Sequence, residues 1–600
     1  MGQMDVPVVT QEMGKWRSAI QNEVKAIRER RRNSERDVRP TKRIKICDNR
    51  SDLLHMEGVI QDVKAKYALD EDQSRAYDIF LNHLKSVEYG PSNYLDESDN
   101  RCMYLGGAGG TGKSRVIRAI IEAFRVLGKS EKLLVSATTG ASAQIINGST
   151  IDALCKFNRT RKGDNREGGY GDNGGLLNTE NYWMGCQFLI IDEVSMLGCH
   201  KLRRISKALR RFKGNALPFG GLFVLFGGDF QQLKPVKDRR LFVEPLMKYG
   251  TTSKKRIDEY NRAYEGYLLW KGVTSRTVVL MRHYRAPDPS VSTVLDRIGR
   301  GEITFEDREV LRRRVFGHRE GPDLGDKQWR NAILVTPRNA VRQAWNNNAA
   351  LRHVQDTGNQ IFISPSQDEG IRCKRHDMVW TVDSKTEFLA TWAVLCIEGP
   401  ALVAANIAVE LGMANGTEVI IKAVVPHEDD EQGWQNIRKP IVKLSRPPIC
   451  VFVEAINGDK NMTEYYPGRP GWFPVFPITE EMATPSEFNA EEKTFVRTQI
   501  PLSPGFAASD YRVQGRGMQR KFILDLRRPP TGRLDLQNIY VMLSRMAKWE
   551  DLAILRPYQE DIFDVPPDPH YLNYDRYLKE QDRHTKVQFL RTNLSFMQTM

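Results

Sequence analysis

Residues 103–124 read MYLGGAGGTGKSRVIRAIIEAF, and they decide how the first part of the chain folds. Gly107 to Ser114 match the pattern G-x-x-x-x-G-K-[ST] at every specified position. A short apolar run precedes the pattern and a helix-like stretch follows it, which is the context of a phosphate-binding loop. Such a loop turns backbone amides inward at a helix N-terminus, where they bind phosphate. The stretch therefore predicts a nucleotide site between a strand and a helix.

Each position of this loop has an expected task. Lys113 is long enough to reach the β- and γ-phosphates, and the hydroxyl of Ser114 is a ligand for Mg²⁺. The glycines let the backbone approach the phosphates. The predicted nucleotide-binding set of the loop is Gly107, Gly109, Gly110, Thr111, Gly112, Lys113 and Ser114.

The apolar stretch FLIIDE, residues 188–193, supplies the second half of the site. A buried strand here would deliver Asp192 at its carboxyl end, where the carboxylate holds the metal ion beside Ser114. Glu193 follows directly and is placed to polarise the attacking water. Loop and acid pair together predict a nucleoside triphosphatase and leave ATP and GTP open.

Three more polar side chains follow apolar strand-like runs or begin helices. Gln232 lies in GDFQQLKPV, residues 228–236, and is a candidate sensor of the γ-phosphate. Arg285 and Arg545 end the stretches HYR and LSR in a later part of the chain. An arginine that projects from one lobe onto a nucleotide held by another couples lobe closure to hydrolysis. All three are candidate catalytic residues, although each arginine taken singly fits a surface or packing role better.

The wider sequence places these motifs in an α/β fold. Strand-like runs alternate with helix-like stretches from Met103 to Val236, which indicates a parallel sheet covered on both faces. A second alternation starts at Thr277 and resumes at Lys521. Short β-like runs with many Pro, Gly and Asn fill residues 375–499, so we expect an all-β insertion there.

Composition narrows the class of partner. The chain has 600 residues, with 89 Lys plus Arg against 75 Asp plus Glu, and this net charge of +14 favours a polyanion such as nucleic acid. Its eight cysteines form no C-x-x-C pair, which argues against a zinc ribbon or a disulfide framework. The longest apolar run, Phe388 to Ile397, has ten residues, about half of what crosses a bilayer. We therefore predict a soluble, intracellular protein with no membrane partner.

Two basic clusters lie near the N-terminus, RERRR at residues 28–32 and KRIK at residues 42–45. They fit a two-part nuclear import signal or a phosphate-binding arm equally well as a solvated arm. If the source is eukaryotic, they predict a nuclear location.

The ordered motifs resemble one family closely, the superfamily 1B DNA helicases of the petite-integration-frequency (Pif) type. More distant likenesses are to RecD and to the helicase part of Helitron-type transposon proteins. The resemblance spans Leu69 to Pro557. It rests on LDEDQ (69–73), GGAGGTGKS (106–114), SATTGASA (136–143), GSTID (148–152), LIIDEVSML (189–197), GDFQQLKPV (228–236), LMRHYR (280–285), ILVTPRNAV (333–341), GMANGTEV (412–419), YRVQGRG (511–517) and YVMLSR (540–545).

The resemblance implies two RecA-like P-loop domains with parallel sheets, a small wedge insertion in the first and an SH3-like β-rich insertion in the second. The implied parts are 1–60, a basic N-terminal arm that we expect to be disordered; 61–275, domain 1A with the wedge at about 148–181; 276–375 with 500–560, domain 2A; 376–499, domain 2B; and 561–600, a C-terminal tail.

The resemblance also implies the activity: an ATP-dependent DNA helicase that moves 5′→3′ on single-stranded DNA and opens partial duplexes, in repair, recombination, replication or telomere maintenance. ATP and Mg²⁺ are the implied ligands. Gln73 would read the adenine, and Arg285 and Arg545 would be fingers from the second lobe. The positions implied to contact DNA are Thr139, Gly140, Thr336, Pro337 and Gln514.

This chain departs from the family pattern in two strand-contacting stretches. Asp152 stands where family members usually carry His, and residues 511–517 lack the usual Ser and Thr hydroxyls. Two alternatives therefore stay open. One is a transposon-derived nucleic-acid-binding NTPase with weak or no unwinding. The other is a helicase subunit that depends on a protein partner, bound through the N- or C-terminal extension.

Overall fold

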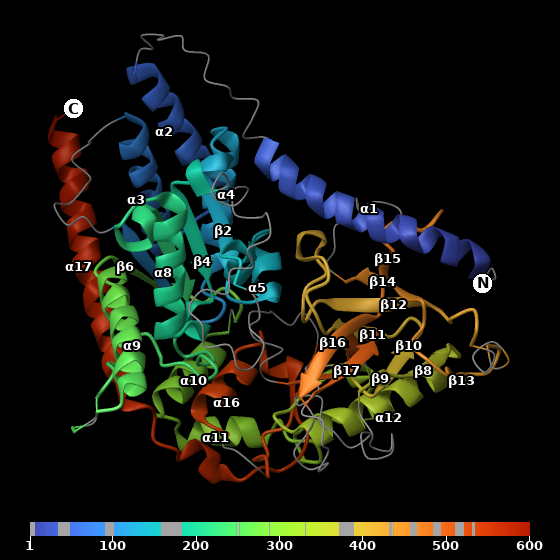
Figure 1. Cartoon of the computed structure of the whole chain (residues 1–600). Coiled ribbons are helices and arrows are strands. Elements are labelled where there is room, and N and C mark those ends of the chain that lie inside the picture. The colour runs from blue at the N-terminus through green and yellow to red at the C-terminus, as the bar shows by residue number, and fades with distance from the viewer. Residues whose placement is uncertain are drawn as a thin grey trace.

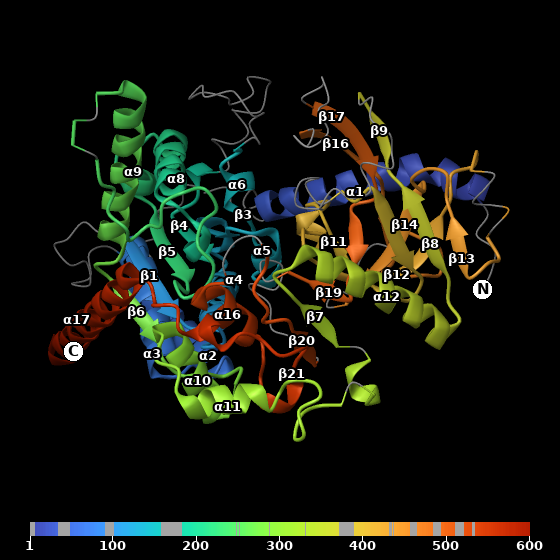
Figure 2. The same cartoon turned by 90° about the horizontal axis from the view of Figure 1, so that it is seen from below.

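The computed structural model comprises two parallel-sheet lobes and a β-rich unit, across which helix α1 (Val6–Asn33) lies (Figure 1; Figure 2). No helix in the described part of the chain is long and apolar enough to cross a membrane. The structure describes residues 6–33, 49–89, 101–157, 183–247, 249–250, 252–286, 288–323, 325–330, 332–370, 389–430, 435, 437–456, 465–483, 494–509, 521–530 and 534–599.

The first lobe is built on a sheet with the strand order β3-β2-β4-β5-β1-β6, and all its pairings are parallel. Strands β4 and β5 are buried along their whole length, as expected for a parallel sheet covered on both faces. The strands are β1 (Cys102–Gly107), β2 (Leu133–Ala137), β3 (Ser149–Thr150), β4 (Phe188–Asp192), β5 (Phe223–Gly228) and β6 (Thr277–Leu280).

Helices cover both faces of this sheet and form two cores. Helix α8 shows why: Leu202, Ile205, Leu209 and Phe212 recur at helical spacing and are buried, and the helix ends at Gly214 in the left-handed conformation. The helices of this lobe are α2 (Asn49–Lys66), α3 (Glu71–Tyr89), α4 (Lys113–Val126), α5 (Gly140–Ile145), α6 (Ile151–Leu154), α8 (Cys199–Lys213), α9 (Lys254–Val273) and α17 (Pro569–Thr599).

Two predicted boundaries of this lobe are wrong. Thr277–Leu280 was expected to open the second domain, but it pairs with β1 as the edge strand of the first sheet, reached through the long helix α9. Residues 561–600 were expected to be a tail, but α17 packs along β6 (Figure 1). The reason is an apolar stripe on α17, in which Tyr571, Tyr574 and Leu578 join the core of the first lobe.

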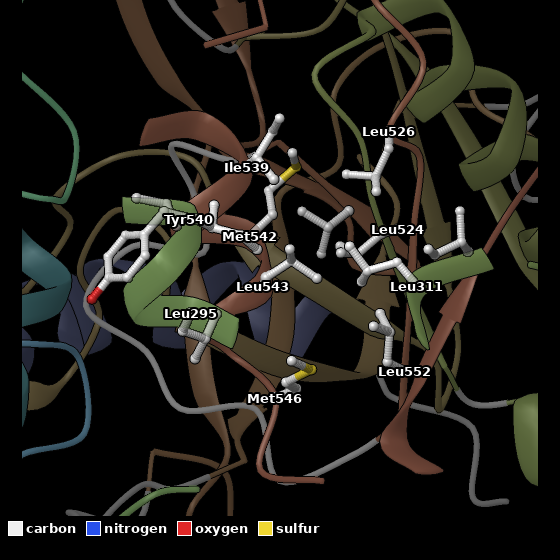
Figure 3. Close-up of a cluster of buried hydrophobic side chains, with 14 of the residues drawn as sticks. Leu295, Leu311, Leu524, Leu526, Ile539, Tyr540, Met542, Leu543, Met546 and Leu552 are labelled. Carbon is white, nitrogen blue, oxygen red and sulfur yellow. The ribbon is translucent and has the colours of Figure 1, made fainter. Parts of the chain in front are cut away.

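The second lobe has a smaller parallel sheet with the order β19-β7-β20-β21. Its core lies between this sheet and helices α10, α11 and α16, and Figure 3 shows part of it. The elements are β7 (Ile333–Val335), β19 (Ala507–Ala508), β20 (Phe522–Leu524), β21 (Leu552–Ile554), α10 (Pro289–Arg300), α11 (Phe305–Arg312), α12 (Asn339–Thr357) and α16 (Leu536–Leu543).

The β-rich unit interrupts the second lobe, as expected, but it begins earlier than residue 376. Strand β8 already pairs with β10, because the apolar run IFISP completes that sheet. The SH3-like character of the unit stays a prediction. Its strands are β8 (Ile361–Pro365), β9 (Gln367–Glu369), β10 (Trp392–Cys396), β11 (Pro400–Val403), β12 (Glu418–Val425), β13 (Ile441–Lys443), β14 (Cys450–Ala455), β15 (Phe473–Val475), β16 (Ile478–Ala483), β17 (Thr494–Gln499) and β18 (Leu502–Pro504).

The predicted disorder of residues 1–60 is wrong for the part that the structure describes. Helix α2 belongs to the core of the first lobe. In α1, Trp16 is buried and meets Phe452 of the β-rich unit edge-on, with ring centroids 5.4 Å apart. Charge alone suggested an open arm, whereas one face of α1 is apolar and packs. Basic residues 42–45 lie outside the described residues, so the import signal stays a prediction.

Candidate nucleotide-binding site

The phosphate-binding loop lies at the carboxyl end of β1, immediately before α4. Gly110 and Gly112 have φ angles of 95° and 91°, which side-chain-bearing residues rarely adopt. Neighbours also press on the loop. A Cβ on Gly110 would lie 2.6 Å from the Cβ of Arg285, and one on Gly112 would lie 2.3 Å from Nε2 of Gln73. Glycine is therefore needed here for both conformation and space.

Lys113 is the first residue of α4, and its side chain folds back over the loop. Its Nζ donates hydrogen bonds to the carbonyl oxygens of Gly107 at 2.6 Å and Ala108 at 3.2 Å. The ammonium group therefore lies over the loop, and its contact with phosphates stays a prediction.

Asp192 ends β4, and its side chain is buried in the first lobe. Burial raises the pKa of this carboxyl, and the charge of Lys113 acts in the opposite direction. A Cβ on Gly227 would lie only 2.8 Å from Oδ1 of Asp192, so glycine keeps the space beside the carboxylate open. Together with the hydroxyl of Ser114, this oxygen donor set fits Mg²⁺. Glu193 follows in a left-handed conformation with φ 58°.

Gln232 is buried on the loop after β5. Its Nε2 donates to Oδ2 of Asp229 at 3.1 Å. Its Oε1 is buried and accepts no hydrogen bond from the described residues. A buried acceptor without a partner costs free energy, which points to a group that is supplied by a ligand or a water.

Two arginines face the loop beside Gln232. From a Cβ built on Gly109, Nη2 of Arg545 is 3.3 Å away, Nη1 of Arg285 is 3.5 Å away and Nε2 of Gln232 is 3.7 Å away. Burial lowers the pKa of both arginines, and for Arg545, where the charge of Arg285 adds to the effect, to about 10. Two cations held together in a buried site form a site for an anion.

The origin of Arg285 differs from the prediction. It was expected as a finger from the second lobe, but it lies five residues beyond the end of β6, where the chain leaves the first sheet. Arg545 does come from the second lobe, directly after α16. The two are joined because Nη1 of Arg285 donates to the carbonyl oxygen of Ser544 at 3.0 Å.

Sequence reasoning missed Tyr540 of α16. Its hydroxyl donates to Oδ2 of Asp229 at 3.1 Å and accepts from the amide of Gly109 at 3.4 Å. Figure 3 shows its hydroxyl pointing away from the apolar core of the second lobe. Tyr540 therefore links the second lobe directly to the loop of the first. Its position one helical turn before Ser544 was the available signal.

Gln73 lies against the loop, as its predicted place requires, but its amide is used within the protein. Nε2 donates to the carbonyl oxygen of Thr111 at 3.1 Å, and Oε1 accepts from the amide of Asp70. Asp70 in turn accepts from the hydroxyl of Tyr284 at 2.6 Å. The reading of adenine by Gln73 stays a prediction.

The described residues that are expected to contact DNA belong to both lobes, two to the first and two to the second. Thr139 caps α5, and Gly140 is buried against the β-rich unit, where a Cβ would lie 2.5 Å from Oδ1 of Asn406. Thr336 is buried and donates to Oδ2 of Asp525 at 3.0 Å, and Pro337 follows it. Gln514 lies outside the described residues. Contact of these positions with DNA stays a prediction.

Asp152, where the chain departs from the family pattern, has a partner. Its carboxylate accepts from Nζ of Lys201 on α8 at 2.8 Å. The pair holds α6, where the expected wedge insertion begins, against α8. Residues 158–182, most of that insertion, lie outside the described residues.

A phosphate-binding loop at the end of a parallel strand, an acid pair on another strand of the same sheet, and an arginine from a second parallel-sheet lobe define the two-lobed P-loop class of nucleotide-binding proteins. Within this class, residues 91–247 match the model of the family described as PIF1-like helicase. The match confirms the resemblance of the chain to the Pif-type superfamily 1B helicases.

Curated relatives agree with this family. The chain is 23% identical to the ATP-dependent DNA helicase RRM3 of Saccharomyces cerevisiae, over 77% of this chain and 64% of that protein. It is 30% identical to the ATP-dependent DNA helicase PIF5 of Trypanosoma brucei, over 35% of this chain and 23% of that protein. The chain thus covers less than two thirds of the length of these relatives.

Solved structures confirm the fold. Pif1 of Candida albicans matches with a TM-score of 0.54 and 20% identity, over 85% of this chain and 99% of the other. Bacteroides Pif1 bound to single-stranded DNA matches with a TM-score of 0.55 and 18% identity, over 86% of this chain and 97% of the other.

Proposed function

We propose that this chain is an ATP-dependent DNA helicase, which couples ATP hydrolysis to movement along single-stranded DNA and to the opening of partial duplexes. The observation that carries the proposal is the convergence of Arg285, Arg545 and Gln232 on Gly109 of the phosphate-binding loop. Arg545 belongs to the second lobe, so its positive charge reaches a triphosphate on the loop only when the two lobes are together. The catalytic site is therefore complete only in that closed arrangement.

The residues divide the hydrolytic work. The loop amides and Lys113 bind the β- and γ-phosphates, and Mg²⁺, held by Ser114 and Asp192, would neutralise part of their charge. Glu193 accepts the proton of the attacking water, which Oε1 of Gln232 helps to orient. Arg285 and Arg545 stabilise the charge that develops on the transferred phosphoryl group.

A short path of hydrogen bonds supports coupling between a bound DNA strand and the acid pair Asp192 and Glu193. The hydroxyl of Thr138 donates to the carbonyl oxygen of Glu193 at 2.9 Å, and its amide donates to that of Asp192 at 3.2 Å. Thr139 and Gly140, the predicted strand contacts, follow directly. A DNA strand that moves α5 would therefore shift Glu193 relative to the phosphate-binding loop. Such a shift makes the rate of hydrolysis sensitive to DNA.

The remaining features of the proposal come from charge and family. The net charge of +14 favours a nucleic-acid partner, and Bacteroides Pif1 has been solved with single-stranded DNA. Movement is 5′→3′, the location is nuclear in a eukaryotic source, and the roles are those of DNA repair, recombination, replication or telomere maintenance.

The test compares two partial duplexes that differ only in the end carrying the single-stranded tail. With ATP and Mg²⁺, we expect the 5′-tailed duplex to open and the 3′-tailed duplex to stay closed. Opening of the 3′-tailed duplex alone would overturn the direction. Opening of neither, with hydrolysis still stimulated by DNA, would favour the partner-dependent alternative, and absence of both would favour a nucleic-acid-binding protein without motor activity.

A further inference from the structure

Helix α17 lies along β6 at the outer edge of the first sheet (Figure 1). Two of its polar side chains accept hydrogen bonds from that edge. The amide of Thr277 donates to Oγ1 of Thr585 at 3.0 Å, and the amide of Val279 donates to Oδ1 of Asp582 at 3.0 Å. Both amides belong to β6, the last strand of the described sheet. It pairs with β1 along one edge, and no described strand pairs with its other edge. Thr585 and Asp582 thus satisfy the exposed edge of this strand.

Asp582 makes a second set of contacts that Thr585 lacks. Its Oδ1 also accepts from Nη2 of Arg75 at 2.7 Å, and its backbone oxygen accepts from Nη1 at 3.2 Å. Arg75 lies on α3 and is only 3% exposed. Its Nη2 also donates to Oδ1 of Asp72 at 2.9 Å in the first turn of α3. Asp582 therefore connects β6, which β1 fixes by pairing, with the start of α3.

The start of α3 is where the chain meets the nucleotide loop. Gln73 precedes Arg75 by two residues and lies against Thr111 and Gly112 of the loop. If the carboxylate of Asp582 is removed, Asp72 supplies the remaining carboxylate that accepts a hydrogen bond from the buried guanidinium of Arg75 among the described residues. The guanidinium of Arg75 is then paired with the first turn of α3, which carries Gln73, and is no longer tied through the Asp582 carboxylate to β6.

We propose that Asp582, on the C-terminal helix, is a positioning residue of the nucleotide site: through Arg75 it sets the place of Gln73 against the loop and so tunes recognition of the base. The inference rests on the proposed ATPase function and on the predicted reading of the adenine by Gln73. Asp582 itself contacts neither the loop nor the residues expected to react.

The experiment compares four single variants and one double variant of the full chain by steady-state hydrolysis of ATP and GTP and by thermal melting. Asp582→Ala removes the connection, and Gln73→Ala removes the side chain that it is proposed to place. Thr585→Val removes a contact to the same strand edge without touching α3. Glu580→Ala removes an exposed carboxylate of the same helix, whose Oε1 lies 3.9 Å from Nε2 of His584.

We expect Asp582→Ala to raise the KM for ATP about fivefold, the effect of one ordinary hydrogen bond, and to lower the preference for ATP over GTP. Because Lys113, Glu193 and Arg545 are untouched, kcat should change less than KM. The double variant with Gln73→Ala should be no worse than Gln73→Ala alone, since the two residues act in series. Thr585→Val should lower the melting temperature and leave KM and the nucleotide preference unchanged, and Glu580→Ala should change nothing.

Two results would overturn the inference while the proposed function stands. One is an Asp582→Ala variant that melts lower but keeps the KM and the ATP preference of the parent. The other is a double variant in which the effects of Asp582→Ala and Gln73→Ala on KM multiply. A parent chain that hydrolyses no ATP would overturn the proposed function first, and the inference with it.

Discussion

Replacement of Arg545 by alanine probes the anion site between the lobes. Arg545 is 1% exposed, and its side chain is fixed within the second lobe, where Nε donates to the carbonyl oxygen of Val541 at 3.1 Å and Nη2 to Oγ of Ser544 at 2.8 Å. The guanidinium is thus held in place before any phosphate arrives. Arg545→Ala removes this charge and leaves Lys113 and the loop intact.

The size of the effect follows from the geometry. With Nη2 only 3.3 Å from the Cβ position of Gly109, the guanidinium is close to any phosphoryl group bound on the loop. A unit charge about 4 Å from a developing charge contributes about 4 kcal/mol at an effective dielectric constant of about 20. That energy corresponds to a fall of about 10³ in kcat. The repulsion with Arg285 disappears at the same time, so we expect no large loss of folding stability.

The assay is single-turnover ATP hydrolysis with saturating single-stranded DNA, accompanied by nucleotide binding and a thermal melt. Arg314→Ala is the matched control, because Arg314 is an arginine of the same lobe whose pKa is also lowered by burial, and it donates to the carbonyl oxygen of Leu552 instead of facing the loop. We expect the control to keep its turnover. An Arg545→Ala variant that turns over at the parent rate would refute the assignment of Arg545 to the nucleotide.

Three further outcomes are expected. Lys113→Ala should abolish ATP hydrolysis with an unchanged thermal melt, because Lys113 lies on the loop and not in a core; hydrolysis at the parent rate would show that the site is misplaced. Tyr540→Phe should weaken the contact between the lobes, because it removes the bonds to Asp229 and Gly109, and small-angle scattering without nucleotide should then detect a more open chain; unchanged scattering would count against the link. His83 on α3 stacks on Phe223, and burial lowers its pKa from 6.5 to about 4. As the pH falls, His83 is protonated in the unfolded chain before it is protonated in the folded chain. The free energy of unfolding is therefore full above pH 6.5 and decreases by up to about 3 kcal/mol as the pH falls toward 4. In urea unfolding at pH 7 and pH 4.5, His83→Phe should reduce the difference in unfolding free energy between the two pH values. An equal difference in the variant and the parent would exclude His83 as the source of the pH dependence.

Local pattern was enough to predict the central strands of the first sheet. The buried runs FLIID and FVLFGG have continuous apolar character, which is typical of strands in a sheet covered on both faces, and they form β4 and β5. The run TVVL of β6 has the same character, but nothing local states which of two sheets it joins. Long-range pairing with β1 decides that, and the sequence does not display it.

The termini show a second limit of local pattern. Residues 28–45 are rich in charged side chains, and this composition predicts an open arm. Burial of Trp16 of α1 against the β-rich unit, and of Tyr574 of α17 against Phe242, depends on surfaces that exist only after folding. An apolar stripe at helical spacing was the available signal in both helices.

At the site, the residues that a motif fixes could be placed from the sequence, and those that complete it from afar could not. Lys113 begins α4 after the loop, Asp192 ends β4 and Gln232 follows β5, while their roles toward a nucleotide stay predictions. Tyr540 and Asp582 act across hundreds of residues of chain, through hydrogen bonds that no spacing rule describes.

The central claim, that a nucleic-acid strand controls the nucleotide site, is tested most directly by the rate of ATP hydrolysis of the full chain with and without single-stranded DNA. The path from Thr138 to Glu193 leads us to expect a rate that rises at least tenfold with DNA, the effect of about 1.4 kcal/mol on the barrier. The gain should fade as salt is added, because phosphate contacts are released. An equal rate with and without DNA at low salt would contradict the account.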